Sequence, residues 1–144
     1  MVMWIYQNKE FTENDIGKYI GFVYLITNKT NNRRYVGKKL FWFSKTRTVK
    51  GKKKKEKALS DWQDYWSSSE ELKAEVKKLG EENFTREILY LCSNKGTMSY
   101  LEAREQFAHR VLENPNEWYN DQKDKCYSEE FVVTPEFWYS KSVL

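Results

Sequence analysis

Residues 21–39, GFVYLITNKTNNRRYVGKK, contain two short apolar runs separated by a polar turn. The first run, residues 22–26, is rich in β-branched and aromatic side chains, and residues 28–32 (NKTNN) have the composition of a tight turn. The extended pattern resumes at Tyr35. This stretch predicts a β-hairpin that brings Tyr24 and Tyr35 onto neighbouring strands. Taken alone, the pattern fits two packed tyrosines as well as it fits a site that uses both hydroxyls.

Three further elements are predicted downstream of this hairpin. A capping box, Ser68 with Glu71 three residues later, predicts a helix that ends near Gly80. Residues 84–92 alternate well enough to predict a strand. Residues 98–112 predict an amphipathic helix, with an apolar face made of Leu101, Phe107, Ala108, Val111 and Leu112.

The order strand, strand, helix, strand, helix predicts a small domain of the α/β (α+β) class, with a three-stranded antiparallel sheet flanked by helices. We expect the domain to occupy residues 20–121, preceded by an extension (1–19) and followed by a tail (122–144). A short helix is also expected over residues 58–66.

Positive charge is concentrated in one segment. The chain of 144 residues has a net charge of +4, whereas residues 38–57 contain ten cations and one anion, a net +9. A basic block in an otherwise acidic chain indicates a polyanionic partner, and nearby aromatic rings favour nucleic acid, because bases stack on rings. A solvated loop is the alternative. We expect a long mobile loop whose nucleic-acid contacts are Lys38, Trp42, Lys45, Lys50, Lys52, Lys53, Lys54 and Lys55.

Other classes of protein find little support. The chain has no run of 18 apolar residues and no secretory signal pattern, so we expect a cytoplasmic protein without a membrane partner. Cys92 and Cys126 are too few for a disulfide scaffold, and they lack the spacing of a metal site.

The hairpin resembles the paired motif of the GIY-YIG endonuclease superfamily. Val23-Tyr24 is followed, eleven residues after Tyr24, by Tyr35-Val36-Gly37, and Phe22 stands where the first motif has its glycine. Three segments resemble those of the phage-type, SegE-like branch, which includes free-standing homing endonucleases. They are the lysine-rich insertion, DWQDYWSSSEEL and LGEENFTREIL. The resemblance covers about residues 20–121. It implies a DNA endonuclease that uses one divalent cation, Mg²⁺ or Mn²⁺.

The resemblance also implies roles for particular residues. Tyr24 would act as the general base or position the attacking water, and Tyr35 would hold Tyr24 or the phosphate. A free tyrosine has a pKa of about 10, so cations beside it would be needed to make it a base. The implied metal ligand is Glu105, with Glu102 as the alternative on the same helix, and Asn120 matches the asparagine of the motif.

The family's arginine after the second motif half has no clear counterpart. The role passes to Arg47 or to a lysine, of which Lys38, Lys39 and Lys45 are the candidates. His109 lies four residues after Glu105 and so shares its helix face.

Two other functions stay open at this point. One is a nucleic-acid-binding module on the same fold with weak or no catalysis, and the other is a small basic RNA-binding protein. The sequence also leaves open a homodimer, and with it the choice between a nick and a double-strand break.

Overall fold

A computed structural model describes residues 2–120. The predicted tail (122–144) and Cys126 lie outside these residues. The predicted hairpin is confirmed: β3 (Gly21–Asn28) and β4 (Arg34–Leu40) pair antiparallel, with Tyr24 opposite Gly37 and Ile26 opposite Tyr35. Asn28 closes the turn, because its backbone N–H donates to the Arg33 carbonyl at 2.8 Å.

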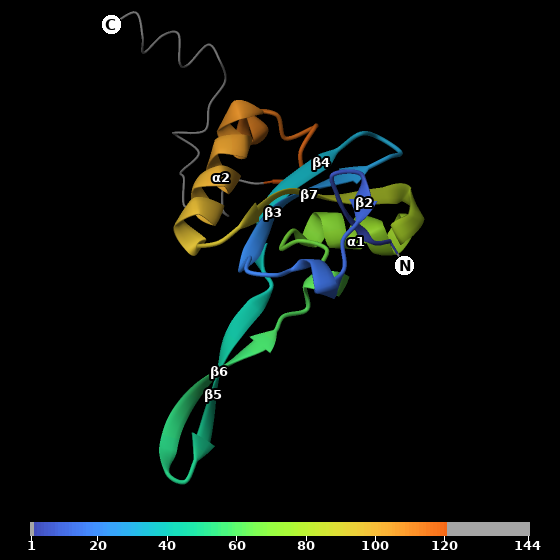
Figure 1. The fold of residues 1–144 in the computed structure, drawn as a ribbon. Helices are drawn as coiled ribbons and strands as arrows, with labels where there is room; N and C mark the ends of the chain where they lie inside the picture. The colour runs from blue at the N-terminus through green and yellow to red at the C-terminus, as the bar shows by residue number, and fades with distance from the viewer. Residues whose placement is uncertain (1, 121–144) are drawn as a thin grey trace, which may run out of the picture.

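The main sheet has five strands rather than the predicted three. β7 (Phe84–Cys92) pairs antiparallel with β3, as expected. The N-terminal segment adds β1 (Trp4–Tyr6), parallel to β7, and β2 (Lys9–Glu10), so the order is β2-β1-β7-β3-β4. The residues expected to form an extension are therefore part of the sheet (Figure 1). β4 lies at one edge of this sheet.

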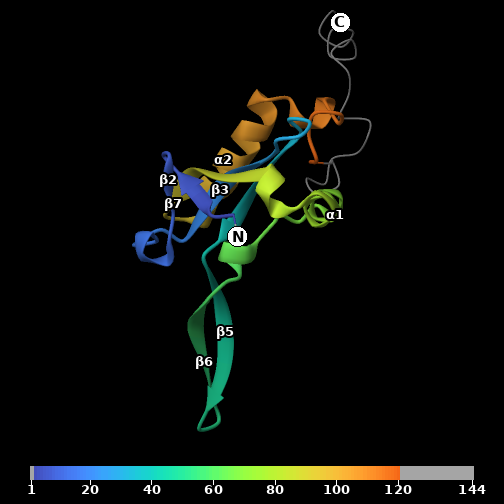
Figure 2. The ribbon, with the colours of Figure 1, turned by 90° about the vertical axis from the view of Figure 1, so that its right-hand side faces the viewer.

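Two helices complete the domain, and each belongs to a different hydrophobic cluster. α1 (Glu70–Leu79) buries Leu72 and Val76 in the cluster that also contains Tyr24 and Tyr35. α2 (Lys95–Ala108) buries Met98 in a second cluster with Val23, Val36 and Trp118. Since successive side chains of a strand point to opposite faces, the tyrosine pair lies on the α1 face and α2 covers the other (Figure 2).

The predicted helix starts need correction by one to three residues. Ser69, not Ser68, is the N-cap of α1, and its hydroxyl accepts a hydrogen bond from the Leu72 N–H at 3.2 Å. α2 begins at Lys95, after the N-cap Asn94, and ends at Ala108. It does not continue to residue 112, because Arg110 adopts a left-handed conformation and a 3₁₀ turn (Val111–Glu113) follows.

The predicted apolar face of α2 is wrong in part. Phe107 is 61% exposed and Ala108 is also exposed, whereas the buried side chains of the helix are Met98, Glu102 and Gln106. These positions are four residues apart, as one helix face requires, but two of the three are polar. Hydrophobic periodicity cannot detect such a face.

The basic segment is a hairpin rather than a loop. β5 (Trp42–Val49) and β6 (Lys52–Leu59) form a separate two-stranded sheet, which projects from the body of the domain (Figure 1). Lys50 (φ 51°) and Gly51 (φ 76°) make the turn; positive φ at both positions suits a two-residue hairpin turn. The predicted helix over 58–66 is replaced by the end of β6 and a 3₁₀ turn (Trp62–Asp64). We call residues 42–59 the basic ribbon.

Among the helices of residues 2–120, none is long and apolar enough to cross a membrane.

Candidate active site

The two tyrosines of the hairpin pack together at the centre of the domain. Tyr24 is 1% exposed and Tyr35 is 4% exposed, and their rings stack with centroids 6.1 Å apart and planes inclined by 25°. Gly37 makes this arrangement possible. A Cβ at that position would lie 2.4 Å from the Tyr24 hydroxyl oxygen and 2.8 Å from Tyr35 Cε1. The glycine of the YVG motif therefore leaves the space that the Tyr24 hydroxyl occupies.

The hydroxyl of Tyr35 is oriented by the segment before α1. It lies 2.9 Å from Ser68 Oγ, and either oxygen can donate the hydrogen bond. Ser68 thus contacts Tyr35, while its neighbour Ser69 caps the helix. The sequence predicts Ser68 as a helix cap, and nothing local in the sequence links it to Tyr35, which is 33 residues away.

Lys39 is the predicted cation that lies beside the tyrosine pair. Its Nζ is 4.0 Å from the centroid of the Tyr65 ring, and that ring packs edge-on against Tyr24 with centroids 6.1 Å apart. Lys39 Nζ also lies 2.7 Å from Asp61 Oδ1, and this hydrogen bond is the main reason that the pKa of Asp61 is lowered. Tyr65 and Asp61 were not predicted as site residues.

The other predicted cations lie elsewhere. Lys38 points to the α2 face, where its Nζ donates to Ser99 Oγ at 2.8 Å. Lys45 and Arg47 lie on the basic ribbon, and Arg47 forms an ion pair with Glu56 at 3.6 Å. The ribbon projects from the body of the domain (Figure 2), so the structure does not bring Lys45 or Arg47 together with the tyrosine pair.

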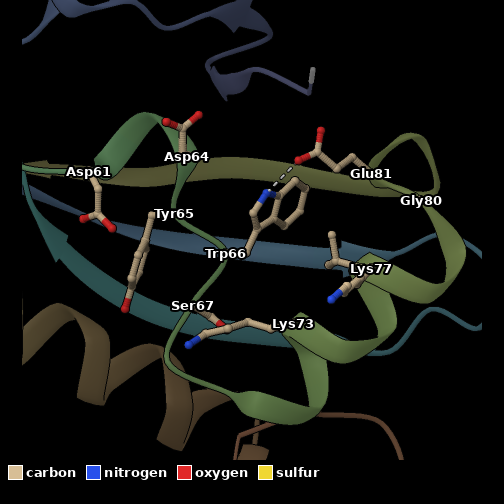
Figure 3. Close-up of a pocket in the computed structure, with 10 residues that line it drawn as sticks. Asp61, Asp64, Tyr65, Trp66, Ser67, Lys73, Lys77, Gly80 and Glu81 are labelled. Carbon is tan, nitrogen blue, oxygen red and sulfur yellow. Dashed lines mark hydrogen bonds between the residues drawn. The ribbon is translucent and has the colours of Figure 1, made fainter.

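An open depression with a volume of about 640 Å³ lies between the residue 61–67 segment and α1. Tyr65 and Ser67 line it from the first segment, and Lys73 and Lys77 from the helix (Figure 3). α1 is the helix that follows β4 in the chain, and it brings lysines rather than an arginine to this depression.

The two candidate carboxylates of α2 have different surroundings. Glu105 Oε1 accepts a hydrogen bond from the Tyr90 hydroxyl at 2.7 Å, and Glu105 Oε2 lies 3.2 Å from His109 Nε2. The bond to Glu105 is the main cause of the raised pKa of Tyr90. Tyr90 packs with the α2 cluster, so Glu105 is engaged on the face opposite Tyr24. Glu102 is 6% exposed and shares the buried helix face with Gln106.

Asn120 binds the free edge of β4 between Tyr35 and Gly37. Its Oδ1 accepts from the Val36 N–H at 3.0 Å, and its Nδ2 donates to the Val36 carbonyl at 2.7 Å. Gln106 Nε2 donates to the same carbonyl at 3.3 Å. Asn120 and Gln106 together fix the strand that carries the YVG motif. The role of Gln106 was not predicted, because a glutamine in an amphipathic pattern reads as a surface residue.

No cluster of three or more histidine, cysteine, aspartate or glutamate side chains suited to a metal occurs within residues 2–120.

The antiparallel hairpin, its tyrosine pair and the motif glycine have the arrangement that the GIY-YIG resemblance implies. The profile of the family described as "Putative endonuclease segE, GIY-YIG domain" matches residues 4–123. The chain belongs to this SegE-type GIY-YIG endonuclease family. The match begins at Trp4, so it includes the first strand of the five-stranded sheet. No curated protein and no solved structure matches the chain.

Proposed function

We propose that the chain is a metal-dependent endonuclease that hydrolyses phosphodiester bonds in DNA. The observation that carries this proposal is the tyrosine pair held over Gly37, with Lys39 beside it. Hydrolysis of a phosphodiester needs an oriented water, an acceptor for its proton and positive charge near the phosphate. Family membership adds an independent argument for this chemistry.

Each requirement has a candidate side chain. The Tyr24 oxygen would orient the attacking water and, as the phenolate, accept its proton. Tyr35, which is hydrogen-bonded to Ser68, would hold the phosphate or the Tyr24 hydroxyl. Lys39, whose ammonium group lies over the ring of Tyr65, would supply positive charge. A lysine gives a point charge rather than the bidentate fork of an arginine, so the geometry of phosphate binding would be less constrained.

A divalent cation, Mg²⁺ or Mn²⁺, would stabilise charge on the phosphate and on the leaving oxygen. Glu105 and Glu102 are the candidate ligands. The motif pattern favours Glu105, whose two oxygens lie against Tyr90 and His109 on the α2 face. Glu102 shares its helix face with Gln106, which reaches the edge of β4 next to Gly37. The helix face that Glu102 shares with Gln106 supports Glu102 as the ligand.

The test is conversion of supercoiled plasmid in Mg²⁺, in Mn²⁺ and in EDTA, by the wild-type chain and by Tyr24→Phe, Glu102→Gln and Glu105→Gln. We expect cutting only with the metal, abolished by Tyr24→Phe and Glu102→Gln and retained at least in part by Glu105→Gln. The reverse order of the two glutamate variants would assign the ligand to Glu105. Absence of cutting by the wild-type chain in either metal would reject the nuclease. A nicked or a linear first product would report whether one or two active sites act, and so whether a homodimer is needed.

A catalytically weak DNA-binding module is the second candidate. It is favoured by one observation: Arg47, the arginine predicted for the catalytic role, lies on the basic ribbon and not beside the tyrosine pair. A band shift of plasmid DNA without cutting in Mg²⁺ or Mn²⁺ would select this function.

The SegE resemblance extends the leading proposal to a free-standing homing nuclease of the phage type. Such an enzyme cuts a narrow set of sites. We expect sequencing of ends generated from a mixed DNA library to give a short consensus, whereas ends spread over all sequences would reject a homing role.

A further inference from the structure

The basic ribbon contributes little to the packing of the folded domain. Residues 43–48 and 50–57 are exposed, and only Trp42 and Leu59 at its base pack against the core. A two-stranded hairpin without a third strand or an apolar cover is marginally stable in water. Closely spaced lysines lower its stability further through mutual repulsion. A polyanion that binds the ribbon would remove that repulsion.

The strand register sorts the side chains of the ribbon into two different faces, because directly paired residues of an antiparallel hairpin share a face. One face, which we call the hydroxyl–lysine face, pairs Ser44 with Lys57, Thr46 with Lys55 and Thr48 with Lys53. All the hydroxyls lie on β5 and all the lysines on β6. This face has three cations and no anion.

The opposite face, which we call the mixed face, is chemically distinct. It pairs Lys45 with Glu56, Arg47 with Lys54 and Val49 with Lys52. It contains the single anion of the ribbon, Glu56, which forms the ion pair with Arg47. Beside DNA, Glu56 would be repelled by the phosphates. The hydroxyl–lysine face is therefore the one suited to enter a strongly negative groove.

The dimensions of the ribbon match one groove in particular. Strands of eight residues span about 27 Å at about 3.4 Å per residue. The major groove of B-form DNA, about 12 Å wide, admits a two-stranded ribbon, whereas the major groove of duplex RNA is too narrow. Lysine can donate to the O6 and N7 atoms of guanine, and serine and threonine hydroxyls can bind any base. The hydroxyl–lysine face thus offers both groups for base recognition.

The base of the ribbon leads directly to the tyrosine site. β4 carries Lys38 and Lys39 and continues through Phe41 into β5, and Asp61 follows β6. A depression of about 600 Å³ at this junction is lined by three lysines, Lys38, Lys39 and Lys95, and by one anion, Asp61, which is paired with Lys39. Trp42 and Phe43 line it from the ribbon. A duplex held by the ribbon would have its backbone beside these cations, close to Lys39 of the candidate active site.

We propose that the basic ribbon inserts into the major groove of duplex DNA with its hydroxyl–lysine face toward the base edges. The proposal deepens the proposed function, since it rests on DNA being the substrate. It assigns recognition to residues that lie outside the catalytic site.

The test is fluorescence anisotropy in EDTA, where binding is measured without cutting. The probes are one 30-base-pair DNA duplex, the same duplex with glucosylated 5-hydroxymethylcytosine, which fills the major groove, and the matching RNA duplex. We expect the modified DNA and the RNA to bind at least about tenfold more weakly than plain DNA. Netropsin, which occupies the minor groove, should have little effect. Equal affinity for plain and modified DNA would overturn the proposal, as would RNA that binds as tightly as DNA.

Two triple variants with equal charge changes identify the inserted face. Lys53→Gln/Lys55→Gln/Lys57→Gln alters the hydroxyl–lysine face, and Lys45→Gln/Arg47→Gln/Lys54→Gln alters the mixed face. Each removes three exposed cations and so should reduce the salt slope of binding by at most about 3. Only the first should also abolish discrimination between plain and modified DNA. Loss of discrimination in the second variant alone would overturn the assignment of faces. Because nothing is cut in EDTA, a chain that binds as proposed yet never cuts DNA in Mg²⁺ would reject the nuclease and leave the ribbon proposal intact.

Discussion

Gly37 shows how one backbone position controls the candidate site. The strand opposite Tyr24 must have no side chain there, since a Cβ would meet the Tyr24 hydroxyl oxygen at 2.4 Å and Tyr24 Cζ at 2.6 Å. Both contacts are shorter than real Cβ atoms tolerate, and the ring cannot withdraw easily, because Trp4 and Tyr65 pack edge-on against it. The glycine is required by space rather than by an unusual backbone angle.

Gly37→Ala should therefore displace the Tyr24 hydroxyl and sharply reduce plasmid cutting, with a loss of about 1–3 kcal/mol in the free energy of unfolding from overpacking. Gly96→Ala is the matched control. Its Cβ would meet only Asn94 Oδ1, at 3.5 Å, within the first turn of α2. There the change should leave cutting intact and raise stability slightly. Normal cutting by Gly37→Ala would show that the position of Tyr24 is not critical.

Asn120 should act through the strand that it holds. Asn120→Ala removes both hydrogen bonds to Val36 and should lower the free energy of unfolding by about 1–3 kcal/mol, because a buried N–H loses its partner. Cutting should fall at temperatures where the variant is still folded, since Val36 lies between Tyr35 and Gly37. The exposed Asn116→Ala provides the control. A destabilised variant with wild-type cutting rates would limit Asn120 to a folding role.

At the scale of elements, the sequence predicted the strands and the helix whose buried positions are occupied by apolar residues. β3, β4 and β7 have apolar runs, and α1 has apolar residues at helical spacing between a cap and Gly80. β1 and β2 are too short to give a periodic signal. The basic ribbon resembles a loop because lysine has low strand propensity. Its one local sign was the Lys50-Gly51 pair at the turn. In the candidate site, Tyr24, Tyr35 and Lys39 were predicted, whereas Ser68, Tyr65 and Gln106 depend on contacts distant in sequence.

The adjacent serines before α1 give a prediction at this scale. Ser69→Ala removes the N-cap of α1 and should cost about 1 kcal/mol of stability, with cutting unchanged. Ser68→Ala removes the partner of the Tyr35 hydroxyl and should instead reduce cutting with a smaller change in stability. Urea denaturation and plasmid conversion of the two variants would separate these effects. The opposite pattern would restore Ser68 as the cap that the capping box predicts.

At the scale of the whole molecule, the candidate site residues lie on two different faces of the sheet, and the two faces meet at the edge strand β4. The tyrosine pair packs on the α1 face, while Glu102 and Glu105 belong to the helix on the other face. β4 is the edge strand, and Gln106 and Asn120 bind its outer side at Val36. The two faces can therefore cooperate only around this edge, beside Gly37. The same strand continues toward the basic ribbon, so the proposed DNA contacts and the tyrosine site adjoin one strand.

The N-terminal strand should prove essential to this architecture rather than an extension of it. Trp4 is 1% exposed, its rings pack against Phe22 and Tyr24, and its Nε1 donates to the Trp62 carbonyl at 2.8 Å. Trp4→Ala should leave a cavity in the core and lower the free energy of unfolding by about 3–5 kcal/mol, as measured by urea denaturation. Tyr100→Ala, at a position 64% exposed on α2, should change it by less than about 0.5 kcal/mol. If Trp4→Ala also cost less than about 1 kcal/mol, β1 would be a dispensable addition. A large loss would show instead that the minimal nuclease domain begins before residue 20, because the packing of Tyr24 depends on a side chain from the first strand.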